Sequence, residues 1–168
     1  MEGYELSASV VLWRGHGILL MKRNGGFGGG GWFLPGGHIE MAERPAEAAA
    51  RELMEEAAIA LDPSALSLAS VMSYTHDGRM AHTLIYNALC PEGAEAVINE
   101  EHLAARWYEP EAAIARFFDS TMLRERGVSE ANIALAAEVA RAIREAVEAR
   151  GMRLPGEARP ADAPVTPW

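Results

Sequence analysis

An α/β fold is predicted for this chain, because segments typical of β-hairpins alternate along it with segments typical of helices. Apolar and β-branched stretches separated by short turn sequences indicate two hairpins. Strong helix formers follow the first hairpin, and a long amphipathic segment follows the second. The 168 residues approach the usual length of one domain, and a hydrophobic content of 49% is sufficient for a buried core.

The first hairpin is predicted over residues 6–13 and 17–22, whose apolar stretches are separated by three turn residues. Residues 25–31, GGFGGGG, follow it and contain too much glycine for the interior of a helix or strand. We expect a mobile loop there, leading into a short strand at 32–34. The loop matches the G-x-G-x-x-G pattern of dinucleotide-binding proteins, but no helix follows it. It therefore predicts a strand connection, with a loop that closes over substrate as the alternative.

The second hairpin is predicted over residues 66–76 and 80–89, because Asp77-Gly78 between them is a strong signal for a two-residue turn. A further strand is expected at 105–108. The hairpins and this strand together would supply most of one sheet.

A helix is predicted over residues 45–57, where Ala, Glu, Leu and Met follow Pro45 at the first helical position. A second, shorter helix is expected to begin at Pro110 and run toward Phe118. The first of these helices carries the chemistry considered below.

The last helix is predicted over residues 129–150, where apolar residues recur at spacings of three and four between a serine and a glycine. Its apolar stripe is expected to pack on the sheet of its own domain, and a homodimer interface is the alternative. Residues 151–168 contain four prolines and no periodicity. We therefore expect a single domain over residues 1–150 and an irregular tail at 151–168.

The 24 acidic and 15 basic residues leave a formal net charge of −9. Such a charge repels a phosphate backbone, which excludes a nucleic-acid duplex as the main partner. The excess is concentrated in residues 37–58, with four acidic residues in excess, and in residues 92–111, with five. A cation bound there would make the local field attract phosphates.

The one cysteine, Cys90, cannot form an intramolecular disulfide, and the N-terminal residues lack the pattern of a secretory signal. No run approaches the roughly 18 apolar residues needed to cross a bilayer. We therefore expect a cytoplasmic protein without membrane association.

Three carboxylates share one edge of the helix predicted at 45–57. At 100° per residue, Glu52, Glu55 and Glu56 fall within an arc of about 100°, beside an apolar face. Like charges at these spacings destabilise a helix, so the cluster requires a compensating cation. Hard oxygen donors at this density suit Mg²⁺ or Mn²⁺. The alternative is a solvated acidic helix edge.

The residues around these carboxylates have a fixed spacing. The pattern comprises Gly37, Glu43, Arg51, Glu52, Leu53, Glu55, Glu56 and Ile59. Over residues 37–59 it resembles the box of the Nudix hydrolase family, G-x5-E-x7-R-E-U-x-E-E-x-G-U, in which U is aliphatic. One defined position departs from the box, because Ala58 stands where the family has its last glycine. Glycine at this position would allow a left-handed helix cap, which alanine adopts only at a cost of about 1 kcal/mol, so the departure bears on how the helix ends.

The resemblance implies an α/β/α sandwich around a mixed β-sheet. It also implies a pyrophosphohydrolase that requires Mg²⁺, with Mn²⁺ as a substitute. The metal ligands would be Glu52, Glu55 and Glu56, with a backbone carbonyl of Gly36 or Gly37. An ion pair between Arg51 and Glu43 would connect the loop to the helix.

Members of this family differ in the carboxylate that accepts the proton of the attacking water. The candidates here are the box residues Glu52 and Glu55, and Glu100 and Glu101 in the second acidic segment. Glu100 and Glu101 could equally be surface residues or additional metal ligands. Lys22 and Arg23 are candidates for binding substrate phosphates, and Tyr74 or Trp32 could stack on a base, although core packing or solvent exposure would explain each of them too.

The function predicted from the sequence is metal-dependent hydrolysis of a nucleoside diphosphate linked to a moiety X. Nucleoside triphosphates, nucleotide sugars and dinucleoside polyphosphates remain open as substrates, because the box supplies metal chemistry and not substrate selection. The alternative is a catalytically weak module of the same fold that senses nucleotides or binds a protein.

Overall fold

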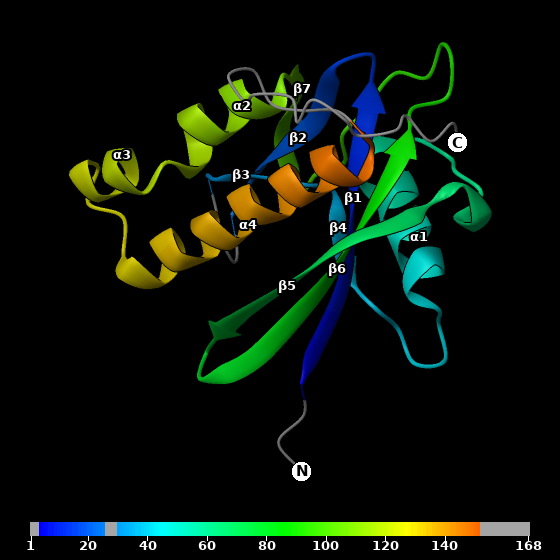
Figure 1. The fold of residues 1–168 in the computed structure, drawn as a ribbon. Coiled ribbons are helices and arrows are strands. Elements are labelled where there is room, and N and C mark those ends of the chain that lie inside the picture. The colour runs from blue at the N-terminus through cyan, green and yellow to red at the C-terminus, as the bar shows by residue number, and fades with distance from the viewer. Residues whose placement is uncertain (1–3, 26–29, 152–168) are drawn as a thin grey trace, which may run out of the picture.

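The computed structural model describes residues 4–25 and 30–151 (Figure 1). The glycine-rich loop expected at 25–31 lies mostly outside the described residues. The same holds for nearly all of the proline-rich tail expected at 151–168.

The centre of the fold is a seven-stranded mixed sheet with the order β3-β2-β1-β6-β5, in which β4 also pairs with β1 and β7 with β2. Among the described strands, β1 and β6 pair in parallel and the other pairs are antiparallel. The strands are β1 (Glu5–Arg14), β2 (Gly17–Arg23), β3 (Trp32–Phe33), β4 (Gly36–His38), β5 (Ser67–His76), β6 (Arg79–Leu89) and β7 (His102–Tyr108).

Helices cover both faces of this sheet, which confirms the predicted α/β class and its three layers. Figure 1 shows α1 on one side and α2, α3 and α4 on the other. The α-helices are α1 (Pro45–Ala57), α2 (Pro110–Ala113), α3 (Ser120–Glu125) and α4 (Glu130–Ala149), joined by a 3₁₀ turn η1 (Pro63–Ala65) and a π-helical turn η2 (Ile114–Phe118). Among the described helices, none combines the length and apolarity required to cross a bilayer.

Strand β1 lies at the centre of the sheet and contributes to two hydrophobic cores. Val10 and Leu12 pack with α1, whereas Val11 and Trp13 pack with α4, and all four are buried. Successive side chains of a strand point to opposite faces, so a strand covered on both sides is apolar without alternation. This explains the uninterrupted apolar sequence of residues 10–13 in the first predicted strand.

Both predicted hairpins are confirmed, as are the helix over 45–57 and the strand that ends at Tyr108. The predicted last helix is α4, and the hydroxyl of Ser129 caps its N-terminus. The short helix expected to begin at Pro110 divides into α2 and η2.

Strand β4, the turn η1 and helix α3 were not predicted. The sequence does not predict strand β4, because glycine occupies two of its three positions. Its conformation depends on pairing with β1, in which Gly36 lies opposite Ser9 and Gly37 opposite Ala8. An added Cβ on Gly36 would collide with the carbonyl oxygen of Ala8. Tertiary pairing therefore creates a strand where propensity predicts a loop.

Helix α1 ends at Ala57, and Ala58 forms its C-terminal cap. Ala58 adopts the left-handed conformation, with φ 55° and ψ 29°, and its N–H donates to the carbonyl of Met54. A residue with a Cβ is strained in this conformation, so the missing glycine affects stability rather than the path of the chain.

Helix α4 is fastened to β5 by a charged network. The guanidinium of Arg141 donates to Glu138, to Glu145 and to the carbonyl of Val71 on β5. Glu145 also accepts a hydrogen bond from the hydroxyl of Ser70, which holds the pKa of this carboxyl below its ordinary value with further help from Arg141. The network therefore requires the ionised form of Glu145.

We predict that Ala58→Gly stabilises the protein by about 1 kcal/mol, because glycine adopts the left-handed cap without strain. Chemical denaturation measures the change. Ala60→Gly is the matched control, since Ala60 is exposed and has no positive φ. That variant should be neutral or less stable, and equal stabilisation by both substitutions would contradict the explanation.

We predict that Glu145→Gln destabilises the protein by about 1 kcal/mol at pH 7 and not at low pH. Because the folded pKa of Glu145 is depressed, its stabilising effect is present above the ordinary value of 4.5 and disappears as the pH falls through the folded value. Denaturation curves between pH 3 and 7 test this. Glu148→Gln, at an exposed position on the same helix, should show no such pH dependence.

Candidate active site

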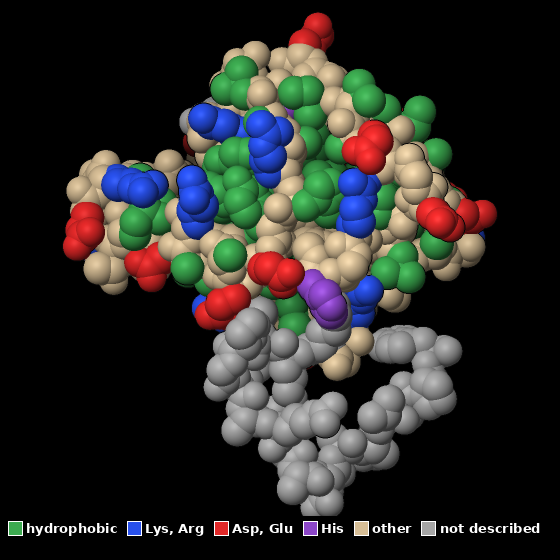
Figure 2. Space-filling view, turned by 90° about the horizontal axis from the view of Figure 1, so that it is seen from above, with side chains coloured by type: hydrophobic (Ala, Val, Ile, Leu, Met, Phe, Trp, Pro, Cys, Tyr) green, Lys and Arg blue, Asp and Glu red, His purple; other side chains and the backbone are tan. Residues whose placement is uncertain are grey.

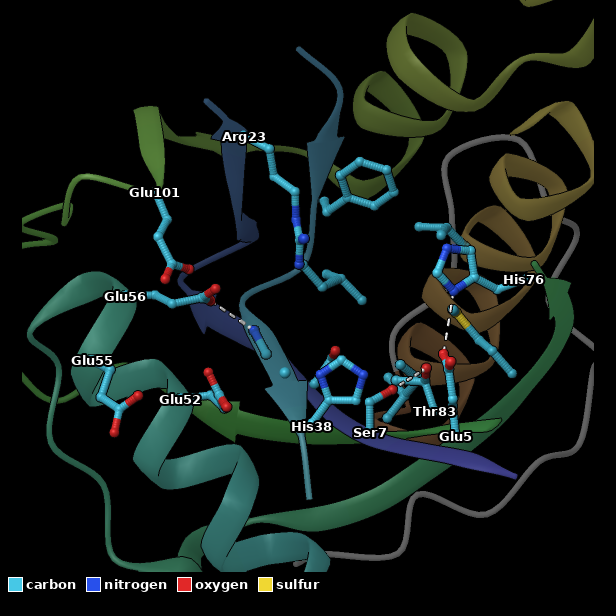
Figure 3. A pocket seen from close by; sticks show the side chains of 18 of the residues that line it. Glu5, Ser7, Arg23, His38, Glu52, Glu55, Glu56, His76, Thr83 and Glu101 are labelled. Atoms are coloured by element: carbon cyan, nitrogen blue, oxygen red, sulfur yellow. Dashed lines mark hydrogen bonds and ion pairs between the residues drawn. The ribbon is translucent and has the colours of Figure 1, made fainter. Parts of the chain in front are cut away.

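A cavity of about 500 Å³ lies where α1 and β4 face the sheet and α4. On the face shown in Figure 2, acidic side chains are scattered. In the cavity of Figure 3, by contrast, Glu52 and Glu56 point from α1 toward β4, and Glu101 points toward Glu56 from the segment before β7. Glu55 points away from this group, although it also lines the cavity.

Arg51 connects the loop after β4 to helix α1. Its guanidinium binds both carboxylate oxygens of Glu43, with Nε to Oε1 at 2.8 Å and Nη2 to Oε2 at 3.0 Å. Nη2 also donates to the carbonyl of His38, and Nη1 to Glu52 at 2.8 Å. The hydrogen bonds from Arg51, and a further one from the N–H of Glu40, hold the pKa of Glu43 below its ordinary value. The ion pair that the resemblance implied is therefore present in the structure, and its geometry is bidentate.

Glu52 lies directly against the backbone of β4. A Cβ added to Gly37 would stand 2.5 Å from the carboxylate carbon of Glu52. Burial raises the pKa of Glu52, against the lowering effect of its hydrogen bond with Arg51. Glycine at position 37 therefore leaves the space that the Glu52 carboxylate occupies.

Glu56 is a buried carboxylate, only 4% exposed. It accepts a hydrogen bond of 2.8 Å from the N–H of Gly36, and Nε2 of His102 lies 3.6 Å from its other oxygen. Burial raises the pKa of Glu56 to about 7, although the Gly36 hydrogen bond and the charge of Arg23 oppose the shift. Burial also lowers the pKa of His102, so the imidazole is a weak counter-charge. Glu56 is thus a largely desolvated carboxylate, and the charge of Arg23 opposes the effect of burial on its pKa without cancelling it.

The segment that carries Glu101 is anchored to the end of α1. The N–H of Val97 donates to the carbonyl of Ala57, and that of Asn99 to the carbonyl of Glu56. Both Glu100 and Glu101 are exposed, but Glu101 lines the cavity and Glu100 does not. The sequence makes Glu100 and Glu101 equal candidates, and the structure places Glu101, but not Glu100, at the cavity.

Oxygen donors of the kind that Mg²⁺ and Mn²⁺ prefer line this end of the cavity. Within residues 4–25 and 30–151, no three Asp, Glu, His or Cys side chains are gathered closely enough to hold a metal ion. Arg51 contributes to the separation of these carboxylates, because its Nη1 binds Glu52 and lies 3.5 Å from an oxygen of Glu55. The donors therefore fit a divalent cation in chemical type, and binding would require Glu52 or Glu55 to rearrange relative to Arg51.

The candidate substrate-binding residues separate into two groups. Arg23 and Tyr74 line the cavity with the box glutamates. Lys22 and Trp32 instead line a second cavity, on the α4 side of the sheet.

Several polar residues of the first cavity belong to none of the motifs found in the sequence. His102 is buried beside Glu56, and its Nδ1 lies 3.0 Å from the side-chain oxygen of Asn99. At the far end, Nδ1 of His76 lies 3.2 Å from Glu5, and the hydroxyls of Ser7 and Thr83 are hydrogen-bonded. No motif spacing connects residues on separate strands, so sequence pattern carries no signal for these pairs.

A family model described as "NUDIX domain" matches residues 3–126. A MutT NUDIX hydrolase from Burkholderia pseudomallei is 26% identical, with a TM-score of 0.62, and the match covers 76% of this chain and 100% of that protein. A C. elegans Ap4A hydrolase is 22% identical, with a TM-score of 0.66 and coverage of 88% and 98%. A bifunctional NMN adenylyltransferase/ADP ribose pyrophosphatase from Francisella tularensis, complexed with AMP and a Mn ion, is 23% identical; the TM-score is 0.57 and the coverage 75% and 42%.

We predict that Arg51→Lys destabilises the protein by about 1–2 kcal/mol, because an ammonium cannot reproduce the bidentate bond to Glu43. Chemical denaturation without added metal measures the loss. Arg79→Lys is the control, since Arg79 is exposed and forms no ion pair with a described residue. Equal stability of both variants would exclude a structural role for Arg51.

Proposed function

Because this chain belongs to the NUDIX domain family, we propose that it is a divalent-metal-dependent hydrolase. It would cleave the pyrophosphate linkage of a nucleoside diphosphate joined to a moiety X. The observation that carries the proposal is the convergence of Glu52, Glu56 and Glu101 on one cavity beside the glycines of β4.

The proposed ligands of Mg²⁺, or of Mn²⁺ in its place, are Glu52, Glu55, Glu56 and the backbone carbonyl of Gly37. The bound ion would neutralise phosphate charge and lower the pKa of an attacking water. Burial of Glu56 favours this role, because a desolvated carboxylate is stabilised in its charged form by a nearby cation.

Other residues of the cavity have positioning roles in this proposal. Arg51 holds the loop and the Glu52 carboxylate in place. Arg23 lines the cavity near Glu56 and offers a positive charge to substrate phosphates. Glu101 faces the same space and is the proposed acceptor of the proton of the attacking water.

The substrate is proposed only as a class. Nucleoside triphosphates, nucleotide sugars and dinucleoside polyphosphates all contain the required linkage. The matched Ap4A hydrolase and ADP ribose pyrophosphatase support this class and do not choose within it.

We predict that Glu52→Gln combined with Glu56→Gln lowers turnover at least about a hundredfold, because two proposed metal ligands lose their charge. A panel of nucleoside diphosphate derivatives with Mg²⁺, with the products identified, measures the effect. Glu47→Gln is the control on the same helix. Its amide oxygen can still accept the hydrogen bond that Glu47 receives from the N–H of Arg44.

Full metal-dependent turnover by the double variant would contradict the proposed site. The alternative function, a catalytically weak nucleotide-sensing or protein-binding module, is favoured by the separation of the described ligand side chains. Nucleotide binding without cleavage of any panel member, with high Mg²⁺ or Mn²⁺, would support that alternative. Rapid turnover of one compound would exclude it.

We predict that Glu101→Gln lowers kcat about a hundredfold and that Glu100→Gln does not, because only Glu101 lines the cavity. The neighbouring glutamates form a matched pair with the same charge. Steady-state kinetics on the best substrate of the panel distinguish them. Equal rates for both variants would assign the proton acceptor to another residue, with Glu52 and Glu55 as the next candidates.

A further inference from the structure

A second cavity, of about 510 Å³, lies between the short strand β3, the turn η2, helix α3 and the first half of α4. It adjoins the first cavity, because Phe33 and Leu135 line both. None of the box residues lines it. The proposed hydrolysis therefore leaves this second cavity without a role.

The charged residues of the second cavity are all basic. Lys22, Arg116 and Arg126 line it, and no Asp or Glu is among its described lining residues. No ion pair joins any of the three to a described residue, whereas their neighbour Arg124 pairs with Glu130 at 2.9 Å. Among the described residues, the positive charge of these three side chains is therefore not neutralised by ion pairs, although the net charge of the protein is −9. The three side chains give this cavity a positive field that requires no metal.

Aromatic side chains form one wall of the second cavity. The rings of Trp32 and Phe117 are stacked, with centroids 5.2 Å apart and planes 28° apart. Tyr108 packs edge-on against both rings, which fixes the stack from the side. Trp32 and Phe117 remain partly exposed, so the stack offers apolar ring surface to a ligand.

We propose that the second cavity binds a phosphorylated aromatic group, of the nucleoside monophosphate type, without a divalent metal. The base would pack on the Trp32–Phe117 stack, and the phosphate would bind Lys22, Arg116 and Arg126. A ligand of this chemistry can be a free mononucleotide or the distal nucleotide of a substrate that extends from the first cavity. The inference is independent of the proposed hydrolase function, because it concerns binding without metal.

Calorimetric titration of the full chain with AMP, in EDTA and without added metal, tests the proposal. AMP should bind, while adenosine and inorganic phosphate should each bind at least about tenfold more weakly, because each lacks one half of the recognised chemistry. The affinity for AMP should fall as salt is added. Absence of AMP binding in EDTA, or equal affinity for adenosine, would overturn the proposal.

Charge-removing variants locate the bound ligand. Arg116→Gln combined with Arg126→Gln should weaken AMP binding about tenfold, because both side chains are exposed and their contribution is partly screened. Arg124→Gln is the matched control on the same surface, and it should leave the affinity unchanged. Glu52→Gln should also leave it unchanged. If Glu52→Gln changes AMP binding and the double variant does not, the ligand occupies the first cavity and the proposal is wrong.

Competition in EDTA distinguishes the two sources of the ligand. If diadenosine tetraphosphate displaces AMP and loses affinity in the double arginine variant, the second cavity holds the distal nucleotide of an extended substrate. If both compounds bind at the same time and only AMP depends on the arginines, the cavity is a separate mononucleotide site. Each of these results supports the proposal, and failure of the arginine variant to affect either compound refutes it.

Discussion

Two glycines allow the candidate active site to exist, because β4 passes between β1 and α1 at a distance that leaves no room for side chains. A Cβ on Gly36 would meet the backbone of β1, and a Cβ on Gly37 would meet Glu52. The close approach brings the N–H of Gly36 to Glu56 and the carbonyl of His38 to Arg51. The positions of the box glutamates thus depend on how the backbone of β4 packs.

The same packing concentrates negative charge in a partly desolvated space. Burial raises the pKa of both Glu52 and Glu56, and Arg51 offsets this effect mainly at Glu52. Buried carboxylates are costly unless a cation or hydrogen-bond donors compensate them. A site of this kind favours a divalent ion, and with the ion bound it favours phosphate. The adjoining cavity also favours anions, but there the positive charge comes from basic side chains and not from a bound metal ion.

Ala58 shows how a departure from the family pattern is accommodated. The left-handed cap forms with alanine instead of glycine, so the end of α1 and the segment that follows it keep their course. Backbone hydrogen bonds from Val97 and Asn99 to the last residues of α1 hold that end in place. The strain of one residue is small beside the packing of the apolar face of α1, which includes Ala49, Leu53 and Ala57.

The sequence by itself determined the α/β class, both hairpins and the limits of α1, because turn chemistry and helix propensity are local properties. Its resemblance to the Nudix box implied the Arg51–Glu43 pair. It did not determine β4, which forms only through pairing with β1, or the separation of Glu101 from Glu100. It also gave no signal for His102 beside Glu56, or for Arg116 and Arg126, which line the second cavity together with the predicted candidate Lys22. These features join residues far apart in the chain, and only the packing of the sheet against its helices brings such residues together.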